Sequence, residues 1–261
     1  MEEFPNNRIE EYPRVPANRL GLWLLTPLVL GVIVIFILSI EWKESLKIEH
    51  VIVQGAGIVP AQDVYGWAKV ELKSPMYGVK LSEVQDRLIA HPFLGSVTVS
   101  RQLPDAFRIQ VVERVPIASL SAGIMQYVDA EGVLLPAMQF PVKLDLPIIS
   151  GVSGVERFRP GDIITSNELF EAIEILRTAQ GIDSSMYRFL SEVNMNGGGD
   201  IILYSNDVVV PILVGRGDIG KKLAMLRAFW SSFVKTNDSR RLQYIDLRYD
   251  DQVVVKWNHQ S

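Results

Sequence analysis

The side chains that could carry catalysis are few and lie far apart in the chain. There are three histidines, His50, His91 and His259, and no cysteine. The histidines lack the short spacing of metal ligands, and no thiolate nucleophile is available. No Gly-x-Ser-x-Gly, His-Glu-x-x-His or phosphate-loop pattern occurs. We therefore expect a protein that is not an enzyme, with no cofactor and no metal site.

Other charged motifs have simpler structural interpretations. The acidic pairs Glu10-Glu11 and Asp250-Asp251 are typical of a solvated tail and a solvated turn. The Gly215-Arg-Gly-Asp218 tetrapeptide resembles an adhesion motif, but a turn after a strand that leads to a helix cap explains it more simply. The net charge of −4 gives no basic footprint, so nucleic acid is not expected as a partner.

The last segment of the chain has a pattern that could bind another protein. In Tyr244–Tyr249, alternation predicts Ile245, Leu247 and Tyr249 on one face of a strand, with Arg248 on the other. Residues 252–257 then form a short β-branched strand. A terminal strand is often a sheet edge, whose unpaired backbone groups must be covered or used. An ordinary edge protected by a lysine and a binding edge both fit this pattern.

The longest element expected is a membrane span over Leu20–Ile40, which contains no charged residue. A helix of this length rises about 31 Å, which matches the roughly 30 Å hydrocarbon core of a bilayer. Trp23 and Trp42 would lie at the two headgroup layers. A buried core helix and a cleaved signal peptide are the alternatives, but the run is long for both, and no small-x-small cleavage site follows it.

The flanks of this span predict its orientation. Three arginines precede it and two lysines follow it, a small excess that favours a cytoplasmic N-terminus. An N-terminal anchor followed by one large body is also a common export design. We therefore predict a cytoplasmic tail at 1–19, a transmembrane helix at 20–40 and an exported remainder, which must fold without disulfides.

Residues 46–115 predict a small α+β domain in the order β-α-α-β-β. A strand ends at Gly55, and a helix follows Pro60. Ser82-x-x-Gln85 has the pattern of a capping box for a second helix. Two alternating strands then flank a turn at residues 103–105.

Residues 116–258 predict a β-rich domain with two or three helices. A hairpin is expected around the turn Asp129–Gly132, and Thr165-x-x-Glu168 has a capping-box pattern before another helix. Strands are expected around 201–204 and 208–214, followed by a helix after Asp218. The fold class predicted for the whole chain is α+β.

These motifs together resemble the FtsQ/DivIB family of bacterial division proteins. VIVQGAGIVPAQDV and HPFLGSVTVSRQLPDAFRIQVVERVPIA are similar to its POTRA domain, a docking module. YVDAEGVLLP, LVGRGD and YIDLRYDDQVVVKW are similar to motifs of its β domain, in the expected order. The resemblance implies a single-pass scaffold in the inner membrane at the division septum, with its C-terminal domain in the periplasm.

The resemblance also implies partners and a binding site. It implies that FtsB and FtsL, small membrane-anchored proteins, bind by strand addition at the C-terminal edge, while the POTRA-like part and the anchor contact other divisome components. Arg248, Tyr249 and Trp257 match the contact positions, and these are residue types enriched in interface hot spots. The residues that would mainly offer backbone are Asp251, Gln252, Val253, Val254 and Val255.

Two other functions remain open from the residues alone. One is a membrane-tethered periplasmic hydrolase of the cell wall, which the absence of a catalytic set disfavours. The other is a POTRA-bearing export chaperone, which would bind unfolded outer-membrane clients rather than division proteins.

Overall fold

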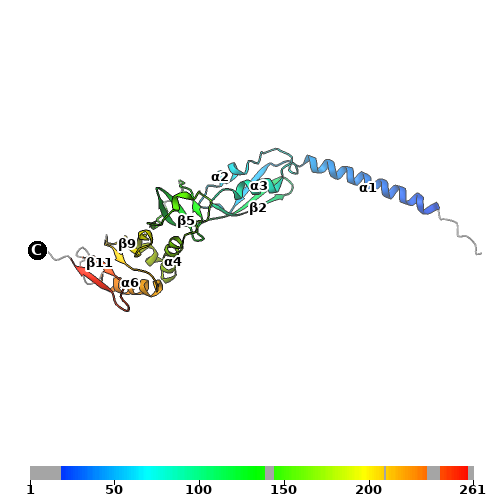
Figure 1. The fold of residues 1–261 in the computed structure, drawn as a ribbon. Helices are drawn as coiled ribbons and strands as arrows, with labels where there is room; N and C mark the ends of the chain where they lie inside the picture. Colours follow the sequence, from blue (N-terminus) through cyan, green and yellow to red (C-terminus); the bar gives the residue numbers. More distant parts are fainter. Residues whose placement is uncertain (1–18, 139–143, 209, 234–241, 258–261) are drawn as a thin grey trace, which may run out of the picture.

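A computed structural model describes residues 19–138, 144–208, 210–233 and 242–257. Most of the predicted tail at 1–19, together with His259, lies outside these residues. Along the molecule the elements follow in a row: the long helix α1, a small α/β unit, and a larger sheet with its helices at the C-terminal end (Figure 1). The fold class is α+β, as the sequence predicts.

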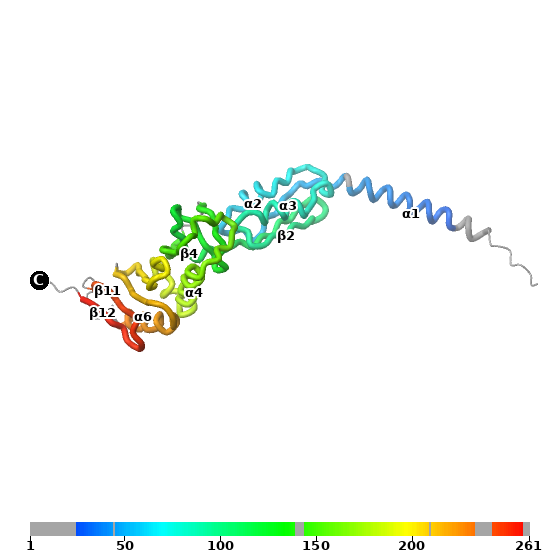
Figure 2. Tube along the Cα trace, in the orientation of Figure 1, coloured from blue at the N-terminus to red at the C-terminus, as the bar shows by residue number. Residues whose placement is uncertain are grey.

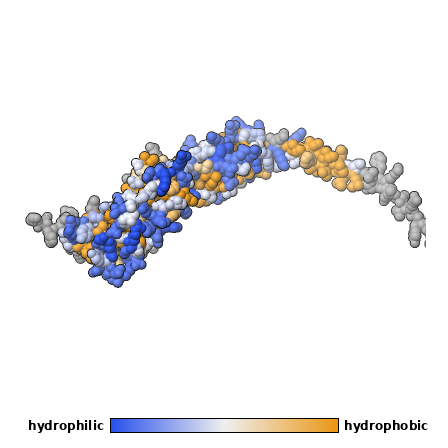
Figure 3. Space-filling view, viewed as in Figure 1, coloured by the Kyte–Doolittle hydropathy of each residue, from blue (hydrophilic) through white to orange (hydrophobic). Residues whose placement is uncertain are grey.

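Helix α1 (Arg19–Ser45) contains the predicted span in full. Within the described residues it is the one helix long and apolar enough to cross a membrane, over Leu25–Lys43, and none of that window is buried. Its surface forms a continuous hydrophobic band, whereas the rest of the visible face mixes polar and apolar residues (Figure 3). An apolar surface of this size is unfavourable in water, so it requires a lipid or protein environment.

The unit that follows α1 has the predicted β-α-α-β-β order. Its sheet has the order β1-β3-β2, with β1 parallel and β2 antiparallel to the central β3. Its elements are β1 (His50–Gln54), α2 (Ala61–Ala68), α3 (Leu81–Ile89), β2 (Leu94–Gln102) and β3 (Ala106–Glu113). The capping box expected at Ser82 is wrong, because α3 begins two residues earlier than that box requires, with Lys80 at the N-cap position.

The residue that directly follows β1 must be a glycine. Gly55 has φ +86°, and a Cβ there would lie 2.0 Å from the carbonyl oxygen of Val111. The chain then turns so that the carboxylate of Glu113 accepts three backbone N–H groups, from Gly57, Ile58 and Val59, at 2.7–3.0 Å. One carboxylate at the end of β3 thus holds the loop that leads into α2.

The second unit is a sheet of nine strands in the order β12-β11-β10-β9-β8-β7-β4-β5-β6. Its strands are β4 (Pro116–Ala122), β5 (Ile124–Asp129), β6 (Leu134–Leu135), β7 (Ile148–Ser150), β8 (Leu190–Asn194), β9 (Ile202–Ser205), β10 (Ile212–Leu213), β11 (Leu242–Asp246) and β12 (Val254–Trp257). Its helices are α4 (Asn167–Ile182), α5 (Ser184–Phe189) and α6 (Ile219–Phe233), with two short 3-10 turns, η1 (Val155–Arg157) and η2 (Asn196–Gly198).

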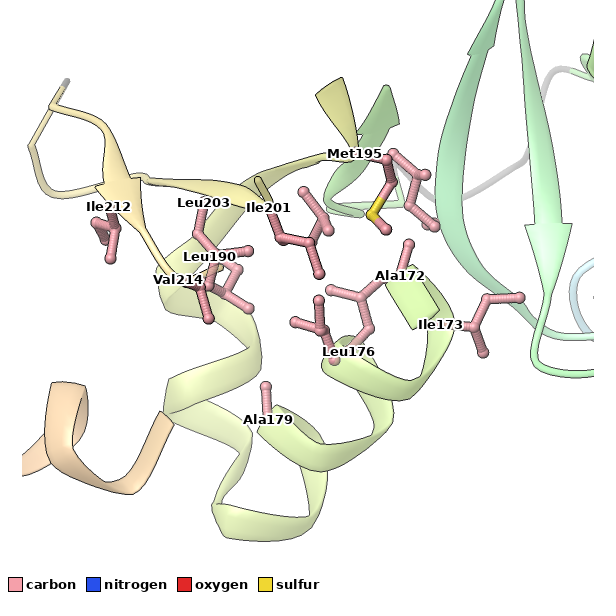
Figure 4. Packing of buried hydrophobic residues seen from close by; sticks show 14 of the residues in the cluster. Ala172, Ile173, Leu176, Ala179, Leu190, Met195, Ile201, Leu203, Ile212 and Val214 are labelled. Atoms are coloured by element: carbon pink, nitrogen blue, oxygen red, sulfur yellow. The ribbon is translucent and has the colours of Figure 1, made fainter. Parts of the chain in front are cut away.

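Helix α4 supplies one wall of the second core. Ala172, Leu176 and Ala179 point from it toward residues of the sheet, among them Leu203 and Ile212 (Figure 4). Its N-cap is Ser166, whose Oγ accepts the N–H of Leu169, rather than the Thr165 that the sequence pattern suggested. Leu169, Ile173 and Leu176, which recur at helical spacing in the sequence, form a buried stripe on one face of α4.

The two units are joined by a packed junction rather than a free linker. Val133 and Leu135, from the hairpin β5–β6, belong to the hydrophobic core of the first unit. Arg114, directly after β3, donates to the buried carboxylate of Asp129 at 2.7 Å. The smooth course of the chain from the first unit into the second is visible in Figure 2.

Candidate partner-binding edge

Strand β12 is the end strand of the nine-stranded sheet. It pairs antiparallel with β11, with Ile245 opposite Val255 and Asp246 opposite Val254. No backbone hydrogen bond outside that ladder reaches 254–257 from the residues that the structure describes. The predicted edge position of the terminal strand is therefore confirmed, although the strand spans 254–257 rather than 252–257.

The hydrogen bonds of β11 decide which backbone groups of β12 are open. Ile245 N–H donates to the carbonyl oxygen of Pro211, and Leu247 N–H donates to that of Leu213, both on the β10 side. The backbone groups of Ile245 therefore point away from β12, so Ile245 and Val255 form a non-hydrogen-bonded pair. The N–H and C=O of Val255 therefore face the open side.

The two faces of this hairpin differ in burial. Val253 and Val255 pack against the second core, so they fix β12 to the sheet. Val254 is 36% exposed and Lys256 is exposed on the other face, where its Nζ lies 5.8 Å from the ring centroid of Tyr244. Trp257 lies opposite Leu242 and is 37% exposed. The edge thus combines open backbone with a half-exposed indole.

The turn between β11 and β12 is organised by Arg248. Its Nε and Nη2 donate to the two carboxylate oxygens of Asp246 at 2.9 and 2.6 Å, and its Nη1 donates to Asp200 at 2.8 Å. These hydrogen bonds lower the pKa of Asp246 and raise the pKa of Arg248. Gly215 leaves room for this arginine, because a Cβ there would lie 3.0 Å from its Cγ.

Tyr249 is where the sequence pattern failed. Strand alternation placed it on the buried face with Ile245 and Leu247, and both of those residues are fully buried. However, β11 ends at Asp246, and Tyr249 lies in the following turn with 52% of its surface exposed. Its exposure next to the open edge makes the ring accessible to a partner. On the buried face of the predicted strand the ring would not have been accessible.

The remaining turn residues are solvated, as the sequence suggested for Asp250-Asp251. Asp251 has φ +59° and forms an ion pair with Lys221 of α6 at 2.7 Å. Gln252 is exposed. The structure therefore brings all eight predicted site residues to one corner: Arg248, Tyr249, Asp251, Gln252, Val253, Val254, Val255 and Trp257.

Three further residues of this corner were not found from the sequence. Asp200 binds Arg248 across 48 positions, and Lys221 binds Asp251 from a separate helix. Tyr244 lies under Lys256 because the two strands pair. The pairing of the last two strands could have indicated Tyr244, but nothing in the local pattern indicates Asp200 or Lys221.

The groups considered for catalysis lie elsewhere and apart. His50 is exposed and lies 4.0 Å from Asp105, while His91 stacks on Trp67 with ring centroids 3.5 Å apart. Burial lowers the pKa of His91. Within the described ranges no group of three or more His, Asp or Glu residues could hold a metal ion. The corner around β12 is thus the site that the geometry singles out.

Comparison with protein families addresses both units. A family model described as "POTRA domain, FtsQ-type" matches residues 46–114, and one described as "Cell division protein FtsQ/DivIB, C-terminal" matches residues 120–248. The chain belongs to the FtsQ/DivIB family. It is therefore a cell-division protein with a POTRA-type first unit. The second match ends at Arg248, so Tyr249 and β12 lie beyond it.

Relatives of similar length support the same FtsQ assignment. A protein named "Cell division protein FtsQ" from Rhodothermus marinus is 28% identical over 264 residues, covering 97% of this chain and 94% of the relative. Its namesake from Geotalea daltonii is 28% identical over 212 residues, covering 80% and 75%. The one from Neisseria meningitidis is 23% identical over 244 residues, covering 92% and 94%.

Proposed function

We propose that this FtsQ-family chain is a non-enzymatic, single-pass scaffold of the division machinery that captures an FtsB-like partner by strand addition to β12. One observation carries the proposal: β12 lies at the end of the sheet, with the backbone of Val255 directed to the open side. A partner strand there would gain main-chain hydrogen bonds, while neighbouring side chains would select it.

The side chains beside the open edge suit such a partner. Tyr249 and Trp257 are aromatic and half-exposed, so a bound strand could bury them. Aromatic side chains dominate interface hot spots because they bury much apolar area at low entropic cost. Arg248 contributes differently: its bonds to Asp246 and Asp200 hold the turn that presents Tyr249.

The topology of the proposal rests on α1. With the N-terminus in the cytoplasm, both folded units lie in the periplasm, where FtsB- and FtsL-like proteins and the septal wall machinery would meet them. The POTRA-type unit and α1 would contact other division components. We also propose the boundaries 46–115 for the first domain and 116–258 for the second.

A pair of proline substitutions tests strand addition at β12. In Val255→Pro the lost N–H faces the open side, so the β11–β12 ladder keeps its bonds. In Val254→Pro the lost N–H belongs to that ladder. With the full chain in lipid nanodiscs, Val255→Pro should abolish capture of an FtsB-like partner while the hairpin resonances remain, and Val254→Pro should disturb both.

A second measurement keeps the test independent of folding. A partner peptide that is N-methylated at alternate residues cannot complete a ladder, yet it leaves this chain unchanged. One of the two methylation registers should lose binding. Strand addition would be refuted if the Val255→Pro variant still captured the partner fully and both methylated peptides still bound. Photocrosslinking from residues 244–257 in dividing cells would then identify whatever binds there.

A further inference from the structure

The end of the POTRA-type unit that adjoins α1 is bonded to the exit of that helix. Met76 N–H donates to the carbonyl oxygen of Leu46 at 2.9 Å, and Ile48 N–H donates to that of Ser74 at 3.0 Å. On the other side, Glu49 N–H donates to the carbonyl oxygen of Asp105 at 2.8 Å. Loop 71–79 and turn 103–105, called here the proximal end, are therefore fixed to the residues that follow α1.

This proximal end carries three large exposed apolar side chains. Leu72 is 50% exposed and Tyr77 is 43% exposed, both in loop 71–79, and Leu103 at the tip of the β2–β3 turn is 49% exposed. Loop tips with small polar residues are the norm for solvated ends of a domain. Apolar tips on both loops next to a membrane helix therefore require an explanation.

The position of these loops along α1 places them at the outer boundary of the lipid headgroups or within that layer, depending on where the span ends. If the hydrocarbon core ends near Ile40, Leu46 lies about 9 Å further along, at 1.5 Å per residue. Headgroups extend about 5–8 Å beyond the hydrocarbon on each side. Tyr77 lies beside the last turns of α1, because its ring centroid is 5.9 Å from Nζ of Lys43. A span that ends at Lys43 would place the whole proximal end deeper.

The charges at this end fit an interface of this kind. Lys43, Lys47 and Lys73 are exposed, and no carboxylate of the described residues lies within 4 Å of their Nζ atoms. Lysines beside a membrane extend their ammonium groups to the headgroups while their stems cover apolar surface. Glu49 and Glu71 lie at the same end, so the surface is mixed, and its apolar tips must carry most of the contact.

We propose that the proximal end lies in the headgroup layer of the bilayer that α1 spans, with Leu72, Tyr77 and Leu103 as its contact residues. Arg101 supports the tyrosine, because it lies 5.0 Å from the ring and donates to the carbonyl oxygens of Met76 and Val79. The contact would orient the first unit on the membrane. Because the junction at Arg114 is packed, it would also set the direction of the large sheet. The inference rests on α1 being a membrane span.

Quenching by labelled lipids tests this contact on the full chain. Because the protein has no cysteine, Leu72→Cys and Leu103→Cys each give a single site for a small fluorophore. Val112→Cys, at the far end of β3 and 60% exposed, is the matched control. The probe is a nanodisc of phosphatidylethanolamine and phosphatidylglycerol with a nitroxide on the headgroup. We expect several-fold stronger quenching at Leu72 and Leu103 than at Val112.

The outcomes separate this inference from the anchor itself. A chain that does not enter nanodiscs would refute the membrane span, whereas a chain that enters and shows equal quenching at all three sites would refute only the headgroup contact. The quenching should also survive about 1 M salt, where the Debye length is about 3 Å. Its loss there would refute an apolar contact. A Leu72→Asp, Leu103→Asp double variant should broaden the distribution of distances between a label at Val112 and the lipid surface.

Discussion

The guanidinium of Arg248 binds both carboxylate oxygens of Asp246, two residues earlier in the chain, and Asp246 is almost fully buried. A planar fork on a carboxylate is a charge-assisted pair with fixed geometry. Here it closes the end of β11 and turns the chain so that Tyr249 leaves the core. Arg248 therefore borders the candidate edge and also fixes the turn that leads into it.

Replacing this arginine should loosen the corner more than the loss of one charge would suggest. In Arg248→Lys the charge remains, but one ammonium cannot bind both oxygens of Asp246 and reach Asp200. We expect lower hydrogen-exchange protection of β11 and β12 and weaker partner capture. Arg227→Lys is the control, since the exposed Arg227 forms an ion pair with one carboxylate of the described residues, that of Asp183. Equal protection in both variants would contradict the role of the fork.

The same pair predicts an acid-sensitive corner. The hydrogen bonds from Arg248 lower the pKa of Asp246 in the folded chain below its ordinary value of 3.8. The charged carboxylate therefore contributes its full stabilisation at pH values above 3.8. It is lost as the pH falls further, through the lowered folded-state pKa. Asp246→Asn should therefore lower the thermal midpoint at pH 7 and reduce the dependence on pH below about 4. A variant curve parallel to the wild-type curve would refute this linkage.

Truncation of the exposed aromatic residues should weaken partner binding without unfolding the domain. Tyr249→Ala and Trp257→Ala should each cost about 2–4 kcal/mol of binding to an FtsB-like partner, which is roughly 30- to 1,000-fold in Kd. Calorimetric titration of the full chain measures this. Ile163→Ala removes a side chain that is 56% exposed elsewhere and should bind normally. Unchanged affinity in both aromatic variants would remove the site assignment.

Glu113 should be essential for the stability of the POTRA-type unit. Its carboxylate accepts three backbone N–H groups, so Glu113→Ala leaves the loop before α2 without acceptors. We expect a loss of about 1–3 kcal/mol in the free energy of unfolding, measured by urea denaturation. Glu83→Ala, on the exposed face of α3, is a control. A loss no larger than that of the control would show that water replaces the carboxylate.

The junction at Arg114 predicts coupled unfolding of the two units. Arg114→Ala leaves Asp129, which is 1% exposed, with the backbone donors of Glu131 and Val133 but without its cation. A loss of about 1–3 kcal/mol is expected. Because Val133 and Leu135 also join the two cores, the wild type should unfold in one calorimetric transition and the variant in two. Two transitions in the wild type would contradict a coupled junction.

Local patterns predicted the elements but not their ends. The order β-α-α-β-β and the buried stripe of α4 follow from side-chain periodicity, because burial repeats with the period of the backbone. The two capping boxes were displaced by one or two residues, since Lys80 and Ser166 stand where Ser82 and Thr165 were expected, whereas α6 begins directly after Asp218 as predicted. Cap identity depends on where tertiary packing ends the loop, and a short pattern does not contain that information.

Local residue patterns were enough to predict the long apolar helix, the two folded units, the family resemblance and a terminal strand. Each of these depends on residues that are close in the chain. The outward direction of the Val255 backbone and the exposure of Tyr249 became visible only in the folded chain. Those facts depend on strand order and on Asp200 reaching Arg248, which are contacts between distant segments, and burial periodicity does not encode which distant segments meet.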